Sequence, residues 1–97
     1  MTDINLCKKK YLKLLSRLCV AEEIFVNKKQ QIAQLIQVNK SLSEQIINHS
    51  SIEGLEMLQD KMTETIDQLM FWVEQDNDDR FFYELKNHIQ WVLDNYS

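Results

Sequence analysis

The fold is decided by residues 4–46, which read INLCKKKYLKLLSRLCVAEEIFVNKKQQIAQLIQVNKSLSEQI. With Ile4 at position a of a heptad repeat, eleven of the thirteen a and d positions are apolar. Such a repeat predicts a helix that packs lengthwise against another helix. The a positions are Ile4, Tyr11, Leu18, Phe25, Ile32, Asn39 and Ile46, and the d positions are Cys7, Leu14, Ala21, Lys28, Leu35 and Leu42.

Two polar residues interrupt this heptad pattern. Lys28 lies in the polar stretch 27–31, where the helix either runs through, with the Lys28 side chain reaching water, or bends. Because the stretch has no Gly or Pro, continuity is favoured. Asn39 either fixes register or partner choice, at some cost in stability, or lies at a solvated edge of a bundle.

The second half of the chain predicts two shorter helices. Residues 48–51 read as a turn, and Ser50 with Glu53 fits a capping box at the start of the next helix. The acidic run 76–79 ends or interrupts that helix, and any of its first three residues can cap another. The apolar stripes of the two helices are Leu55, Leu58, Met62, Ile66, Leu69 and Val73, then Phe82, Leu85, Ile89, Val92 and Tyr96, with Phe81, His88 and Leu93 beside the second stripe.

We therefore predict an all-α fold with helices near 4–47, 51–75 and 79–95, in a single domain covering residues 1–97. The first helix would be about 65 Å long, as would the other two together. Two shapes fit these lengths. One is an antiparallel helical hairpin or three-helix bundle with one long N-terminal helix, and the other is a compact bundle with that helix bent near Asn27.

Composition narrows the classes of protein. One Gly and no Pro argue against an all-β fold and exclude glycine-rich phosphate loops. No apolar run is long enough to span a membrane, and the N-terminal residues do not resemble a signal peptide. Cys7 and Cys19 would lie about 18 Å apart on one helix, too far for a disulfide. We interpret them as small buried apolar side chains, reduced as in a cytoplasmic protein.

Charge is distributed unevenly. Residues 1–48 carry eight basic and four acidic side chains, whereas residues 49–97 carry three basic and eleven acidic ones. This asymmetry suggests that the two halves face each other or face partners of opposite sign. The basic segment Lys8, Lys9, Lys10, Lys13 and Arg17 is a candidate polyanion-binding site for nucleic acid, or for an anionic membrane surface. Both are disfavoured, because the patch is short and the chain is acidic overall.

Catalytic and metal-binding patterns are sparse. His49 with Glu53, and Glu84 with His88, are spaced i, i+4, but each pair supplies only two metal ligands. Adjacent acids such as Asp78 and Asp79 diverge on a helix and are expected to be solvated. We predict no enzyme activity, no cofactor and no metal.

Large apolar residues also lie outside the main stripes, which gives a helix a second apolar face and suggests that the helix packs on two sides. Those faces are either the core of a compact bundle or a docking surface for a second copy or another protein. The candidate partner-binding residues are Phe71, Trp72 and Trp91 as anchors, with Ile32, Asn39 and Ile46 setting register, and also Met57.

The favoured function is a non-enzymatic helical adaptor or chaperone, alone or as a subunit of a hetero-oligomer, that packs against amphipathic helices of a partner. The alternative is a nucleic-acid- or regulator-binding protein that uses the basic segment. In size, acidity and helical pattern the chain is similar to small acidic helical chaperones of bacterial type III and flagellar export, and equally to small helical subunits of larger assemblies. The first resemblance implies a client that presents an amphipathic helix.

Overall fold

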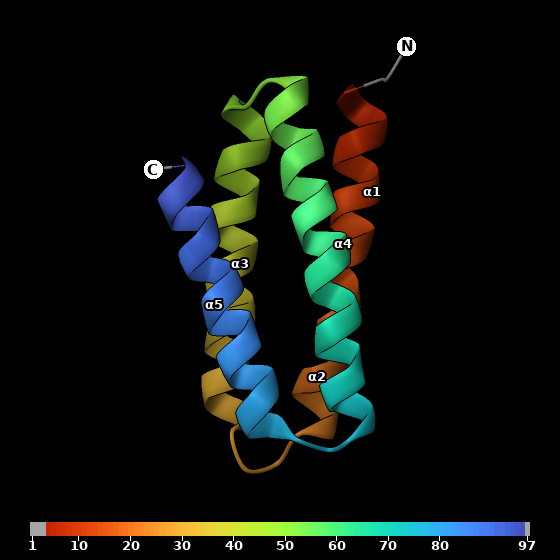
Figure 1. Ribbon diagram of the computed structural model, residues 1–97, viewed down its shortest axis with the longest axis vertical. Coiled ribbons are helices and arrows are strands. Elements are labelled where there is room, and N and C mark those ends of the chain that lie inside the picture. Colours follow the sequence, from red (N-terminus) through yellow and green to blue (C-terminus); the bar gives the residue numbers. More distant parts are fainter. Residues whose placement is uncertain (1–3, 97) are drawn as a thin grey trace.

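The computed structural model describes residues 4–96, and they form an all-α bundle, as predicted. Five helices follow one another: α1 (Ile4–Arg17), α2 (Cys19–Ile24), α3 (Lys29–His49), α4 (Ile52–Glu74) and α5 (Asp78–Tyr96). Because α2 continues α1 after Leu18, the helices make four legs of a bundle whose extents are 42 × 24 × 17 Å (Figure 1).

The legs are arranged so that helices running in the same direction are neighbours. The α1 helix packs against α4, α4 against α5, and α5 against α3. Contacts between α3 and α2, which continues α1, complete the ring. Both α1 and α4 run from the end near the N-terminus toward the opposite end, and α3 and α5 run back (Figure 1). The consecutive helices α3 and α4 therefore occupy opposite corners of the bundle.

The predicted long N-terminal helix is wrong, because the chain reverses direction between α2 and α3. Phe25 is extended, with φ −80° and ψ 136°, and buries its ring in the core. Lys28 directly precedes α3, and its backbone N–H donates to Asp78 Oδ2 at 3.1 Å. Its ammonium lies 3.4 Å from Asp79 Oδ1 and 5.4 Å from the centre of the Phe82 ring. Contacts from α5 thus stabilise a bend that has neither Gly nor Pro, and the compact alternative is confirmed.

The heptad pattern nevertheless identified the interior on both sides of the reversal. All thirteen a and d positions are buried or half-buried. The stripes predicted for α4 and α5 also face inward, although in α5 the buried ring is Phe81 and Phe82 is only half-buried. The a/d phase continues through the loop unchanged, so the inward residues of α1, α2 and α3 read as one uninterrupted repeat.

Polar groups lie inside this core. The hydroxyls of Tyr11 and Ser43 are 2.8 Å apart, and Ser43 Oγ donates to the Asn39 backbone carbonyl at 2.6 Å. Burial raises the pKa of Tyr11 to about 12. Asn39 is fully buried, and neither its Nδ2 nor its Oδ1 has a partner among residues 4–96. Of the two alternatives for Asn39, the solvated edge of a bundle is therefore wrong.

Two further expectations need correction. The side chain that caps α4 belongs to Ser51, which accepts from the Gly54 N–H at 3.3 Å, and the predicted box between Ser50 and Glu53 does not form. Ser51 is preferred because its backbone is extended next to the first helical residue. Cys7 is buried as expected, but the expectation that Cys19 is buried is wrong. Cys19 lies at position b of the heptad, next to the inward-facing Leu18, and is exposed.

The turn between α4 and α5 uses the polar run 76–79. Asp76 has φ 52°, and the N–H groups of Asp76 and Asn77 donate to the carbonyls of Val73 and Trp72 at 3.1 and 3.0 Å. This pair of hydrogen bonds is a Schellman motif with Asp76 in the left-handed position. Asn77 Oδ1 then accepts from the Arg80 N–H at 3.1 Å and caps α5, one of the three caps that the sequence allowed.

Candidate protein-binding face

The outward side of α4 carries a regular stripe of apolar and acidic side chains. Met57, Asp60, Glu64, Asp67 and Phe71 follow one another at steps of three and four residues, so they share one face of the helix. All five are exposed, Met57 at 44% and Phe71 at 50%. We call these five residues the α4 outer stripe. It has an apolar side chain at each end and three carboxylates between them.

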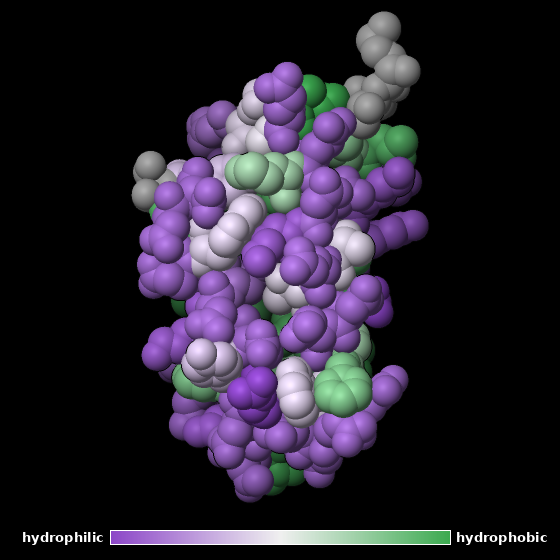
Figure 2. Space-filling model, in the orientation of Figure 1, coloured by the Kyte–Doolittle hydropathy of each residue, from purple (hydrophilic) through white to green (hydrophobic). Residues whose placement is uncertain are grey.

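An aromatic cluster extends the stripe toward α5 at its lower end. The Phe71 and Trp72 rings meet edge to face, with centroids 4.9 Å apart. The Arg80 guanidinium lies over both Trp72 and Tyr83, at 5.1 and 5.7 Å from their ring centres. In the lower part of Figure 2, pale and green side chains lie close to one another among purple ones. The cluster gives the lower end of α4 a broad apolar contact area.

Trp91, the other predicted tryptophan anchor, lies in the seam between α4 and α5. Its ring stacks on His88 at 6.4 Å, and the Lys61 ammonium lies 5.4 Å from its centre. His88 Nδ1 is 3.3 Å from the Thr65 hydroxyl, which ties α5 to α4. Burial, with a smaller contribution from Lys61, lowers the pKa of His88 to about 4. Trp91 thus contacts its own bundle more than it contacts solvent.

The three residues predicted to set register on the first helix lie inside the bundle. Ile32 and Asn39 are fully buried, and Ile46 is 9% exposed. They contact the chain's own helices, whereas Met57 and Phe71 point outward. The acidic residues between Met57 and Phe71 were missed, although their spacing of three and four residues is visible in the sequence.

The basic segment lies on the outward side of α1. Lys9, Lys10, Lys13 and Arg17 are exposed, and Lys8 is half-buried. Within residues 4–96 the two ion pairs are Lys28 with Asp79 and Arg80 with Glu84, so the cations of α1 form none. A surface hollow of about 230 Å³ lies where α1 meets α4 and is lined by Leu6, Cys7, Lys10, Glu56, Gln59 and Asp60. The basic and acidic halves of the chain therefore lie side by side, as their charges suggested.

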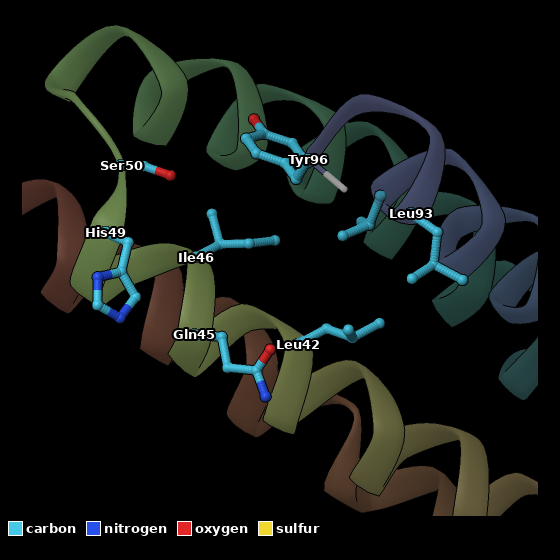
Figure 3. A pocket seen from close by; sticks show the side chains of 8 residues that line it. Leu42, Gln45, Ile46, His49, Ser50, Leu93 and Tyr96 are labelled. Carbon is cyan, nitrogen blue, oxygen red and sulfur yellow. The ribbon is translucent and has the colours of Figure 1, made fainter.

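A larger hollow, of about 430 Å³, lies between the C-terminal ends of α3 and α5 (Figure 3). Its lining includes His49, Ser50 and Tyr96, which are residue types that can do chemistry. Among the described residues no hydrogen bond joins them, and the Tyr96 hydroxyl donates to the Gly54 carbonyl at 2.7 Å. The His49 ring lies well apart from the Tyr96 ring in Figure 3. This arrangement has no nucleophile activated by a base.

Residues 4–96 hold no group of three His, Cys, Asp or Glu side chains arranged to bind a metal ion. No helix within the same residues is both long and apolar enough to cross a membrane. Comparison with known proteins finds no matching family, no similar curated protein and no similar solved structure.

Proposed function

We propose that this protein is a non-enzymatic helical binding module, and that the α4 outer stripe receives an amphipathic helix of another polypeptide. The observation that carries the proposal is the pairing of two half-exposed apolar side chains, Met57 and Phe71, with three carboxylates between them on one helix face. A partner helix that covers this face removes the two apolar side chains from water.

The charge of the stripe defines the partner's chemistry. Asp60, Glu64 and Asp67 take part in no ion pair among the described residues, so their charge is available to a ligand. A helix with Lys or Arg between its apolar positions would match them, whereas an acidic helix would be repelled. Such an adaptor or chaperone would recognise basic amphipathic segments.

Spacing sets the partner's repeat. Met57 and Phe71 are fourteen residues apart, which is two heptads and about 21 Å along the helix. A complementary helix therefore needs apolar residues two heptads apart. The aromatic cluster of Phe71, Trp72, Arg80 and Tyr83 widens the contact at one end of this span.

The exposed cations of α1 support polyanion binding as a second function. Lys9, Lys13 and Arg17 are exposed and can reach phosphates. However, Glu56 and Asp60 line the hollow that also holds Lys10, so a nucleic acid lying there would meet carboxylates. The geometry therefore favours a helix over a phosphate backbone.

A designed peptide tests the proposal. We would label a helical peptide of about 21 residues, with heptad-spaced Leu and with Lys at the flanking positions, and follow its anisotropy on titration with the full chain. Binding is expected, and Phe71→Ala should weaken it about tenfold. Val38→Ala is the matched control, because Val38 is 47% exposed on α3, away from the stripe.

A second peptide tests the charge requirement. Replacing its Lys residues with Glu should abolish binding, since Asp60, Glu64 and Asp67 would repel it. If the two peptides bind equally well, or if Val38→Ala weakens binding as much as Phe71→Ala does, the α4 outer stripe is not the site.

A further inference from the structure

A matching stripe lies on the outward side of α1 and of α2, which continues α1 after Leu18. Leu6, Lys10, Lys13, Arg17 and Val20 follow one another at steps of four and three residues and are all exposed. Leu6 and Val20 are each 48% exposed and, like Met57 and Phe71, are fourteen residues apart. We call these five residues the α1 outer stripe. Like the α4 outer stripe, it has an apolar side chain at each end and three charged side chains between them, but here the charges are positive.

We propose that the occupant of the α4 outer stripe is the α1 outer stripe of a second copy of this chain. This inference rests on the proposed function, because the acceptor is the same face of α4, and it names the partner. Counted from Leu6 and from Met57, the five positions of the two stripes agree to within one residue when the helices run in the same direction. Lys10, Lys13 and Arg17 then lie opposite Asp60, Glu64 and Asp67, a match of charge as well as of spacing.

Within one bundle, the two stripes lie at the same level along the helix axes, as the contact between two copies requires. The α1 and α4 helices are parallel neighbours (Figure 1). Leu6 and Lys10 line the same hollow as Glu56 and Asp60, so the two stripes begin at the same level along the bundle. A two-fold axis parallel to the helices keeps every residue at its own level and exchanges the two sides.

That symmetry forms both contacts at once. The α1 and α2 helices of each copy would lie on α4 of the other, with Leu6 of α1 near Met57 and Val20 of α2 near Phe71. Because the same surface serves both copies, the assembly closes as a dimer and leaves neither stripe uncovered. Within residues 4–96 of a single copy, the six charges of the two stripes form no ion pair, and their four large apolar side chains are half-exposed.

Light scattering behind a sizing column is the first test, on the full chain at concentrations up to about 100 µM. The expected mass is twice the 11.6 kDa of one chain. The variant Lys10→Glu/Lys13→Glu/Arg17→Glu should weaken self-association at least tenfold, and so should Asp60→Lys/Glu64→Lys/Asp67→Lys. Circular dichroism on each peak checks that the variants remain helical.

Mixing the two triple variants makes the test specific. Each variant repels itself, but a mixed pair restores both contacts, so an equimolar mixture should return to the dimer mass. A chain that carries all six reversals should also dimerise, and this rescue holds even if a triple variant folds poorly. A monomeric parent chain, or a dimer that survives either triple reversal, would overturn the inference.

The peptide assay separates this inference from the proposed function. A monomer that binds the basic peptide through Phe71 keeps the proposed function and overturns the second copy as its partner. A chain that neither associates with itself nor binds the peptide overturns both. A dimer that the basic peptide dissociates, with Phe71→Ala reducing the effect, supports both.

Discussion

The backbone N–H of Lys28 donates to the carboxylate of Asp78, fifty residues further along the chain, at 3.1 Å. This hydrogen bond joins the first residue before α3 to the first turn of α5. It holds the reversal of the chain that follows α2, where Phe25 turns into the core. The bend therefore depends on Asp78, which is far in sequence from the residues 25–28 that form it.

Removing the Asp78 carboxylate is expected to loosen this reversal. We predict that Asp78→Ala lowers the free energy of unfolding by about 1–2 kcal/mol, because a half-buried N–H loses a charged acceptor. Asp79→Ala is the control, since that side chain is 78% exposed and its ion pair with Lys28 should contribute less than about 0.5 kcal/mol. Urea unfolding followed by circular dichroism measures both, and equal effects would contradict the assignment.

Asp76 occupies a left-handed backbone position at the end of α4, with φ 52°. Because glycine adopts this conformation without strain, Asp76→Gly should raise the free energy of unfolding by about 0.5–1 kcal/mol. Asp76→Ala keeps a Cβ and should give no such gain. Thermal unfolding of the two variants distinguishes them, and a stabilised Asp76→Ala would show that loss of the carboxylate, not backbone strain, is responsible.

His88 should make the bundle sensitive to acid. Its pKa is about 4 in the fold, below the ordinary 6.5, because it is buried and because Lys61 lies nearby. The unfolded chain therefore binds the proton more readily than the folded chain does. The contribution of neutral His88 to the free energy of unfolding is complete above about pH 6.5 and is lost as the pH falls toward 4. The loss should be on the order of 3 kcal/mol.

A glutamine variant tests this pH dependence. His88→Gln should flatten the dependence of stability on pH between 4 and 6.5, because the glutamine side chain does not titrate. His49→Gln is the matched control, since His49 is exposed. Denaturant unfolding at a series of pH values gives the slopes, and an unchanged slope in His88→Gln would refute the assignment.

Asn39 should be a site of stabilisation by an apolar replacement. Its side-chain amide is fully buried and has no partner among residues 4–96. Asn39→Leu is therefore expected to raise the free energy of unfolding by about 1–3 kcal/mol. Ser43→Ala is the contrasting change, because Ser43 is hydrogen-bonded to Tyr11 and to the Asn39 carbonyl, and its loss should destabilise. A destabilised Asn39→Leu would show that the amide is satisfied in solution.

Much of the interior could be predicted from sequence, because burial follows the helical period. Leu18, Ile32 and Leu58 were placed inward by spacing alone, and all three are buried. The reversal near Lys28 matches the alternative of a bend near Asn27, but continuity was favoured because this stretch has no Gly or Pro. Asp78, which stabilises the reversal, is remote in sequence. Only the folded chain brings these two residues together.

The candidate site was predicted in part. Met57 and Phe71 were identified as lying off the main stripe, and both are exposed. Ile32 and Ile46 were assigned to a partner but lie within the bundle, because an apolar stripe looks the same whether its cover comes from the same chain or from another. The matching stripe on α1 and α2 was missed, since the sequence alone does not show that Leu6 and Val20 face outward.

The corner-to-corner placement of α3 and α4 has a consequence for the order in which the chain assembles. The α1 helix is made first, yet its main neighbour, α4, begins only at Ile52. A nascent chain that ends at His49 therefore holds α1, α2 and α3 without the helix that covers α1. Contacts of long sequence separation must form together, so folding should be slower than in a bundle of successive hairpins. The isolated segment 1–49 should show weak helical circular dichroism, and strong helicity would contradict this reasoning.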